Sequence, residues 1–208
     1  MKIICIGRNY AAHAAELGND RPDRPVVFMK PASAILPNNK PFYYPDFSRD
    51  IHYETELVLK IGRNGRHVQP RFAPDYIKGI TLGLDLTARD LQNDLKKKGH
   101  PWEIAKGFDN SAPLSPDWFA PEDFDDLNDI EFALRKNGTE VQRGHSRHML
   151  FPLTEIICYV SQFFRLQIGD LIYTGTPEGV GPIARGDELE GYLVVEGAEQ
   201  RVLRTLVK

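Results

Sequence analysis

The sequence predicts an α+β fold that consists mostly of β-strands. Strand-like apolar segments recur at irregular intervals, and about three helical patterns lie between them. The regular strand–helix alternation of a doubly wound sheet does not occur. The 208 residues, of which 41% are hydrophobic and 26% charged, suffice for one domain with a substantial core. We therefore expect residues 1–208 to form a single domain.

The N-terminal part of the chain predicts a strand followed by a short helix. Residues 2–7 ("KIICIG") form a brief apolar run that is typical of a strand. The alanine-rich stretch 9–19 favours a helix, which Asn9 can cap and Gly18 can end. We expect this helix to belong to a movable lid within residues 1–25.

The next segments predict two strands separated by loops. A charged, Pro-rich loop at 19–25 precedes a strand in 26–35, which Pro31 ends. Residues 50–62 ("DIHYETELVLKIG") then alternate between polar and apolar side chains, as a half-buried strand does.

The middle of the chain predicts a strand that runs into a helix. Residues 76–87 are strand-like, and residues 88–99 ("ARDLQNDLKKKG") are helical. Thr87 can cap this helix, Asp90 suits its first turn, and Gly99 can end it after a run of lysines.

The remaining residues predict a hairpin, a helix and further strands. Residues 130–144 form a hairpin around Asn137 and Gly138, because Asn-Gly is the strongest short-range hairpin signal. Residues 151–170 show the clearest amphipathic helix pattern, and residues 170–207 read as a strand, a Gly/Pro loop and a hairpin.

Composition excludes several classes of function. A net charge of −3 and a pI near 6.1 leave no basic excess for binding nucleic acid. No stretch approaches the ~20 apolar residues that span a bilayer, and the N-terminal apolar run is too short for a signal peptide. Cys5 and Cys158 lie in apolar strings and are expected to be buried, unpaired residues. We expect a cytoplasmic protein that binds no membrane.

Two glutamates on one strand indicate a metal site. His52, Glu54 and Glu56 share one face of the strand, because successive side chains point to opposite faces. Adjacent buried carboxylates are costly unless a cation neutralises them. The alternative is an ordinary solvated strand face.

Asp85 could complete the metal site. It lies among apolar residues at the end of a predicted strand, where an unpaired carboxylate is expensive. Three carboxylates prefer Mg²⁺, Mn²⁺ or Ca²⁺ over zinc, and they leave coordination positions open for water and substrate. The alternative for Asp85 is a cap of the following helix.

Other polar residues offer acid–base and anion-binding groups. His13 and Glu16 stand at i and i+3 on the first helix, so the glutamate could orient the histidine as a general base. Lys106, Arg89 and Gln92 could hold an anionic substrate. Solvated helix surfaces and ordinary ion pairs are the alternatives. The lysine run at 96–98 is expected to be a solvated helix end.

The loop 173–182 ("YTGTPEGVGP") could cradle an anion. Its glycines expose backbone N–H groups beside the hydroxyls of Thr174 and Thr176. It lacks the lysine and the spacing of a P-loop, so nucleotide binding is not expected. A plain connecting loop is the alternative. Another segment, 143–150, could contribute to substrate choice. For its two histidines, His145 and His148, we expect surface or loop-packing roles.

Six segments spread over almost the whole chain carry the signature of a known family: 5–19, 26–35, 52–62, 83–92, 96–114 and 169–182. Together, and in this order, they resemble the fumarylacetoacetate hydrolase family, most closely its short acylpyruvase members. The resemblance implies a mixed β-sandwich roll with a few short helices. It also implies a homodimer with one divalent ion per subunit, Mg²⁺ with Mn²⁺ or Ca²⁺ as alternatives.

The resemblance assigns roles to individual residues. The family's metal ligands match Glu54, Glu56 and Asp85, and its lid-borne catalytic dyad matches His13 and Glu16. Further matches are the catalytic Lys106 and the substrate-binding positions Arg89, Gln92, Thr176, Arg8 and Lys30.

The activity that the resemblance implies is metal-dependent hydrolysis of the carbon–carbon bond of 3-acylpyruvates, such as acetylpyruvate or fumarylpyruvate. An aromatic catabolic role and a small anionic 2-oxo acid substrate go with it. Because the metal would stabilise a pyruvate enolate in each case, oxaloacetate decarboxylation and isomerisation of unsaturated 2-oxo diacids are the alternatives. A metal-binding scaffold without activity ranks last.

Overall fold

Three β-sheets form the frame of the molecule in the computed structural model, which describes residues 1–16, 18 and 20–208. The largest sheet has the strand order β2-β1-β11-β5-β6-β8-β3. Its strands are β1 (Ile3–Gly7), β2 (Val26–Lys30), β3 (Ile35–Pro37), β5 (Thr55–Ile61), β6 (Ile77–Leu84), β8 (Ala112–Leu114) and β11 (Leu171–Tyr173). β1 pairs in parallel with β11, which places Ile3 beside Leu171.

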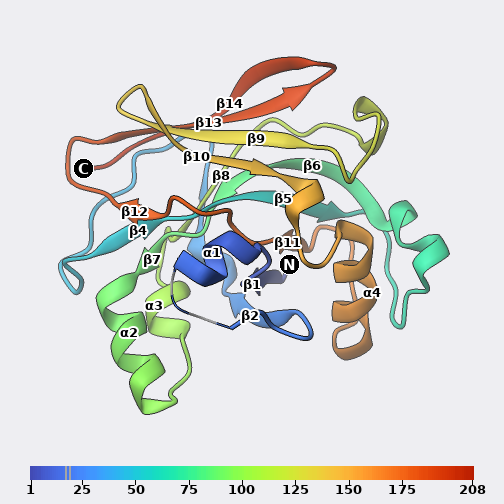
Figure 1. Ribbon diagram of the computed structural model, residues 1–208, viewed down its shortest axis with the longest axis horizontal. Coiled ribbons are helices and arrows are strands. Elements are labelled where there is room, and N and C mark those ends of the chain that lie inside the picture. Colours follow the sequence, from blue (N-terminus) through green and yellow to red (C-terminus); the bar gives the residue numbers. More distant parts are fainter. Residues whose placement is uncertain (17, 19) are drawn as a thin grey trace.

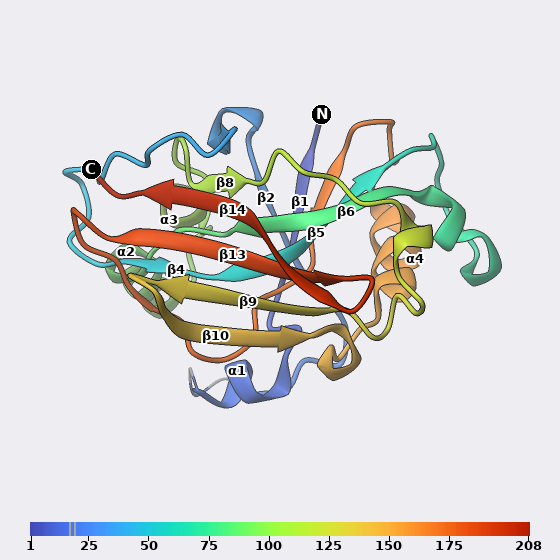
Figure 2. The ribbon, with the colours of Figure 1, turned by 90° about the horizontal axis from the view of Figure 1, so that it is seen from above.

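The second sheet forms a separate layer above the first (Figures 1 and 2). It has the order β10-β9-β13-β14 and consists of β9 (Glu131–Lys136), β10 (Thr139–His145), β13 (Glu188–Val195) and β14 (Ala198–Leu206). A small third sheet has the order β12-β4-β7, with β4 (Ile51–Tyr53), β7 (Thr87–Ala88) and β12 (Gly181–Pro182).

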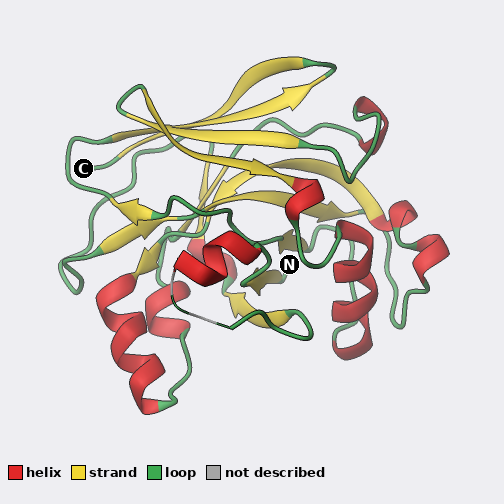
Figure 3. Ribbon diagram, in the orientation of Figure 1, coloured by secondary structure: helices red, strands yellow, loops and turns green. Residues whose placement is uncertain are grey.

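The helices are few and short, and most of them lie below the strands in the view of Figure 3. They are α1 (Ala11–Glu16), α2 (Arg89–Lys98), α3 (Glu103–Lys106) and α4 (Leu153–Phe163), with 3-10 turns at Ala32–Ala34, Pro70–Phe72, Pro74–Tyr76, Pro121–Asp123 and Ser146–His148. Curled sheets with few short helices confirm the predicted, mostly β, α+β class. In the described residues, we find no helix with the length and apolarity that crossing a membrane requires.

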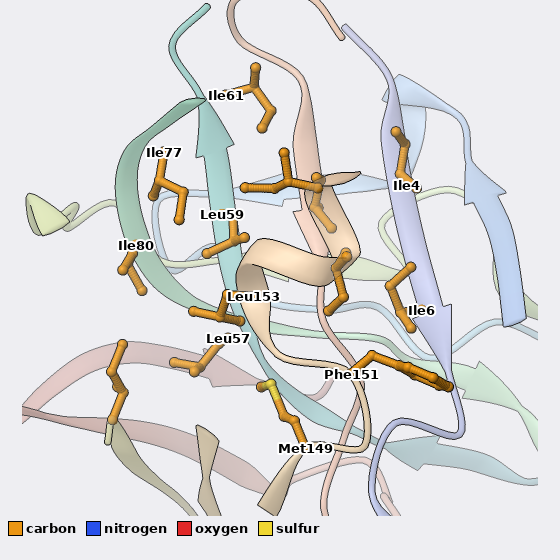
Figure 4. Close-up of a cluster of buried hydrophobic side chains, with 14 of the residues drawn as sticks. Ile4, Ile6, Leu57, Leu59, Ile61, Ile77, Ile80, Met149, Phe151 and Leu153 are labelled. Atoms are coloured by element: carbon orange, nitrogen blue, oxygen red, sulfur yellow. The ribbon is translucent and has the colours of Figure 1, made fainter. Parts of the chain in front are cut away.

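The main hydrophobic core lies between the large sheet, the four-stranded sheet and α4. Leu57, Leu59 and Ile61 of β5 belong to it, and Leu57 lies next to Leu153 at the start of α4 (Figure 4). Val58 points to the opposite face, where it packs with Tyr173 in a separate cluster. Both faces of β5 are therefore buried, which leaves the carboxylates of this segment without direct access to bulk water.

The local signals predicted the hairpin, the first strands and the end of α2 correctly. β9 and β10 meet at Asn137 and Gly138, and Gly99 ends α2 in the left-handed conformation at φ 64°. Cys5 is buried and both cysteines are free thiols, as expected, but Cys158 is only half-buried.

Two predicted helix caps are wrong. The side chain of Asn9 does not cap α1, because its amide donates to the carbonyl oxygens of Phe151 and Thr174 and accepts from the Phe151 N–H. Thr87 belongs to β7, and its hydroxyl donates to the carbonyl oxygen of Asp85; no side chain caps α2. Tertiary hydrogen bonds outweigh the local capping preference at both positions.

Other element boundaries differ from the sequence prediction. The predicted strand 50–62 is two strands of different sheets, and the chain changes sheet at Glu54. α4 ends at Phe163, well before residue 170, and α3 was not predicted. Part of the predicted lid, residues 17 and 19, lies outside the described residues. The single domain and the movable lid stay predictions.

Candidate active site

Three carboxylates converge at the point where β5 begins and β6 ends. Thr55 of β5 pairs with Leu84 of β6, so Glu54 and Asp85 lie opposite each other, and the Asp85 N–H donates to the Glu54 carbonyl oxygen at 2.8 Å. Glu56 follows two residues after Glu54 and belongs to β5. Carboxylate oxygens of Glu54, Glu56 and Asp85 lie within 4.8 Å of one another, and all three residues are buried. We call these residues the acidic cluster.

The acidic cluster fits a divalent cation. Glu56 has no cation within 4.0 Å among the residues that the structure describes, and its carboxylate accepts a hydrogen bond from the Gly175 N–H at 2.7 Å. Burial, reinforced by repulsion from Asp85 and Glu54, raises the pKa of Glu56 well above its ordinary value. Three hard oxygen donors at this spacing, one of them without a cationic partner, suit Mg²⁺ or Mn²⁺ better than a soft metal.

Two cations from neighbouring helices partly neutralise the cluster. Lys106, at the end of α3, places its Nζ 2.7 Å from Oε2 of Glu54 and 2.6 Å from Oδ2 of Asp85. Arg89, at the start of α2, donates to Oε1 of Glu54 at 2.5 Å. Burial alone raises the pKa of Glu54, but Lys106 and Arg89 outweigh it and hold that pKa below its ordinary value.

Lys30 lies behind the acidic cluster and not in the pocket that the cluster lines. Its Nζ is 2.7 Å from Oδ1 of Asp85 and donates to the Ser111 hydroxyl at 2.9 Å and to the carbonyl oxygen of Lys106. This position argues against the substrate contact that the resemblance implied. It suits a residue that holds Asp85 and the end of α3 in place.

The predicted His13–Glu16 dyad faces the acidic cluster. His13 is only 5% exposed and lines the same pocket as the three carboxylates. Its Nδ1 lies 3.2 Å from Oε2 of Glu16, and the Gly179 N–H donates to Oε1 of Glu16 at 3.1 Å. The loop 173–182 therefore fixes the glutamate, and the glutamate in turn orients the imidazole.

The same loop is joined to the strands by a side chain that the sequence did not single out. Gln142 of β10 donates from Nε2 to the Thr176 hydroxyl at 2.9 Å and accepts the Thr55 N–H at 3.0 Å. Thr176 lies in the pocket, as the resemblance implied. A glutamine on a predicted hairpin strand carries no local signal for such a role, because its partners are far away in the sequence.

The pocket around these groups is small and mostly polar. Its lining consists of the acidic cluster, the dyad histidine, several cations and polar groups, and a less polar wall: Glu54, Glu56, Asp85, His13, Arg8, Arg89, Lys96, Lys106, Gln92, Thr176, Ile6, Gly7, Phe28 and Trp102. The space open to the centre of a water-sized sphere is about 30 Å³.

One lining residue contradicts the sequence prediction. Lys96 was expected at a solvated helix end, but it lies half-buried in the pocket while Lys97 and Lys98 are exposed. Arg89, Gln92 and Lys96 recur at i, i+3 and i+7, a spacing that places them on one face of α2. This spacing could have revealed the role of Lys96. None of the residues 143–150 lines the pocket, and His145 instead lies 2.9 Å from Asp129.

Comparison with known proteins assigns the family. A family model described as fumarylacetoacetate (FAA) hydrolase C-terminal matches residues 2–204. The chain belongs to the fumarylacetoacetate hydrolase family. The resemblance to this family that six sequence segments indicated is therefore confirmed. Members of the family are hydrolases and isomerases.

Three relatives illustrate the chemistry found around this chain. The mitochondrial oxaloacetate tautomerase of Bos taurus is 43% identical over 189 residues, which cover 90% of this chain and 85% of that protein. The mitochondrial oxaloacetate decarboxylase of Dictyostelium discoideum is 44% identical over 191 residues, with 91% and 87% coverage. The crystal structure of fumarylpyruvate hydrolase from Pseudomonas aeruginosa, in complex with Mn²⁺ and pyruvate, superposes with a TM-score of 0.90 at 37% identity and covers 100% of this chain and 90% of that one.

Proposed function

We propose that this protein is a divalent-metal-dependent enzyme that interconverts the keto and enol forms of a short 2-oxo acid. Oxaloacetate is the leading candidate for its substrate. The observation that carries the proposal is the position of His13, which Glu16 orients toward a buried acidic cluster. Relatives named for oxaloacetate chemistry, at 43% and 44% identity over about nine-tenths of the chain, support this choice of substrate.

Glu54, Glu56 and Asp85 would hold the metal ion. Mg²⁺ or Mn²⁺ bound there supplies the positive charge that withdraws electrons from the 2-oxo group and its neighbouring carboxylate. Arg89, Gln92 and Thr176 line the same pocket and bind and orient the substrate carboxylate. Lys106 adds positive charge beside the acidic cluster, where charge develops during the reaction.

His13 moves the proton. Because its Nδ1 faces Glu16, its Nε2 is the nitrogen available to a substrate. In the keto-to-enol direction, Nε2 takes a proton from C3 of the 2-oxo acid, and Glu16 stabilises the imidazolium that forms. The proton then passes to the enolate oxygen, which gives the enol. The expected lid movement of α1 would admit substrate and then exclude water.

Hydrolysis of acylpyruvates is the second candidate. The fumarylpyruvate hydrolase that shares this fold favours it, and the same dyad could activate a water molecule instead of taking a proton from C3. Decarboxylation of oxaloacetate would need the same enolate stabilisation without an attacking water. All three reactions use one set of residues. The substrate separates acylpyruvate hydrolysis from the other two, and release of pyruvate separates decarboxylation of oxaloacetate from its tautomerisation.

The test is a comparison of substrates with the purified protein. Enol loss and pyruvate release would be followed with oxaloacetate, and bond cleavage with acetylpyruvate and fumarylpyruvate, each with Mg²⁺, with Mn²⁺ and after chelation. We expect tautomerisation of oxaloacetate to be fastest and to stop when the metal is removed. Faster cleavage of an acylpyruvate would favour the second candidate, and turnover without metal would contradict both. The homodimer stays a prediction that light scattering can check.

A further inference from the structure

The pocket contains two cations that the acidic cluster does not neutralise. Arg89 and Lys106 form ion pairs with Glu54, whereas Arg8 and Lys96 have no carboxylate within 4.0 Å among the residues that the structure describes. Partly buried cations normally have an anionic or hydrogen-bonding partner. A ligand is therefore the natural partner for this second pair of charges.

The structure fixes Lys96 at the pocket wall. Its Nζ lies 5.6 Å from the ring centroid of Trp102, within the range of a cation–π contact. Burial, with repulsion from Arg8 and Arg89, lowers the pKa of Lys96, so its charge is uncompensated where it stands. The exposed Lys97 has no such contact, although it is the next residue on the same helix.

The backbone holds Arg8 in an unusual conformation. Its φ is +59°, a left-handed value that is unfavourable for a residue with a side chain. Arg8 connects the end of β1 to the start of α1, and it lines the pocket together with His13. A strained arginine at the mouth of a pocket is more readily explained by a ligand than by stability.

We propose that Arg8 and Lys96 form a subsite for a second carboxylate, which makes short 2-oxo dicarboxylic acids the substrate class of this pocket. The subsite rests on the proposed function, because it assumes that the 2-oxo end of the substrate lies at the acidic cluster. Lys96 and Arg8 then bind the distal carboxylate. A 2-oxo monocarboxylic acid would leave both cations without a partner.

The test compares two unreactive ligands that differ in one carboxylate. Malate and 2-hydroxybutanoate both present a carboxylate and a hydroxyl to a metal, but malate carries the distal carboxylate as well. Dissociation constants for the Mn²⁺-loaded protein would be measured by titration calorimetry. We expect Lys96→Met to weaken malate binding at least about tenfold, as the loss of one charge-assisted hydrogen bond implies, and to leave 2-hydroxybutanoate binding unchanged.

The variants Arg8→Met and Lys96→Arg complete the comparison. Arg8→Met should act like Lys96→Met, Lys96→Arg should keep most of the preference for malate, and Lys97→Met should bind both ligands like the wild type. The inference is overturned if Lys96→Met weakens both ligands alike, or neither. Absence of any oxaloacetate or acylpyruvate turnover, with the malate preference intact in the wild type and lost in the variants, would overturn the proposed function and leave the subsite standing.

Discussion

Replacing Lys106 by methionine should destabilise the metal-free protein strongly. The change keeps the length of the side chain but removes the cation that lies 2.7 Å from Glu54 and 2.6 Å from Asp85, both of them buried. Removing one partner of a buried ion pair costs about 3–5 kcal/mol. For a chain of this size, that loss lowers the melting temperature by roughly 6–20 °C.

The destabilisation should depend on pH. The pKa of Glu54 is depressed in the folded protein, so its contribution to stability is present above its unfolded value, near 4.5, and is lost as the pH falls. The pKa of Lys106 is raised, because its contacts with Asp85 and Glu54 outweigh burial, so its contribution is present below 10.5 and is lost at higher pH. The difference between wild type and variant is therefore largest between these limits.

Urea denaturation in the presence of a chelator would measure this difference near pH 7 and again near pH 3.5. Lys97→Met, which removes an exposed lysine from α2, is the matched control and should leave the free energy of unfolding almost unchanged. Excess Mg²⁺ should restore part of the stability of Lys106→Met, because a bound cation neutralises the same carboxylates. Equal stability of variant and wild type at pH 7, or a difference that does not shrink on acidification, would refute the reasoning.

Three further predictions concern the metal, the dyad and the loop. Glu56→Gln should weaken Mn²⁺ binding about 100-fold or more. Because the pKa of Glu56 is raised, the Mn²⁺ affinity of the wild type should rise with pH. Calorimetry at two pH values should find that this pH dependence is reduced in the variant. His13→Ala should lower turnover about 10²- to 10⁴-fold, and Glu16→Gln less, with Mn²⁺ affinity unchanged in both; a parallel loss of metal binding would count against a proton-transfer role. Gly175→Ala should cost about 1–3 kcal/mol in a urea denaturation experiment, because φ is +101° and the added Cβ would lie 2.6 Å from Cβ of Asn9; wild-type stability would show that the loop can relax.

Features that depend on close neighbours could be predicted from the sequence. Asn137 and Gly138 both take positive φ values, 54° and 78°, which is the conformation that an Asn-Gly hairpin turn requires. Glu54 and Glu56 were placed together because residues two apart share a strand face. Asp85 and the dyad were candidates with competing alternatives, and the family resemblance decided in favour of the functional roles, with which their positions in the structure are compatible.

Features that depend on distant partners could not be predicted in this way. Asn9 has the residue type and position of a helix cap, but its amide joins Phe151 and Thr174, more than a hundred residues away. Gln142 joins Thr55 to Thr176 and has no local signal at all. Such hydrogen bonds are specified only when the sheets come together, because each partner belongs to a different part of the chain.

The parallel pairing of β1 with β11 has a consequence for synthesis in the cell. Ile3, Ile4 and Cys5 find their partners Leu171, Ile172 and Tyr173 only after nearly the whole chain has left the ribosome, on the order of 10 s later. Until then, one edge of the N-terminal strand stays open to wrong neighbours, including nascent chains of the same kind. We expect newly made protein to depend on chaperones during this interval.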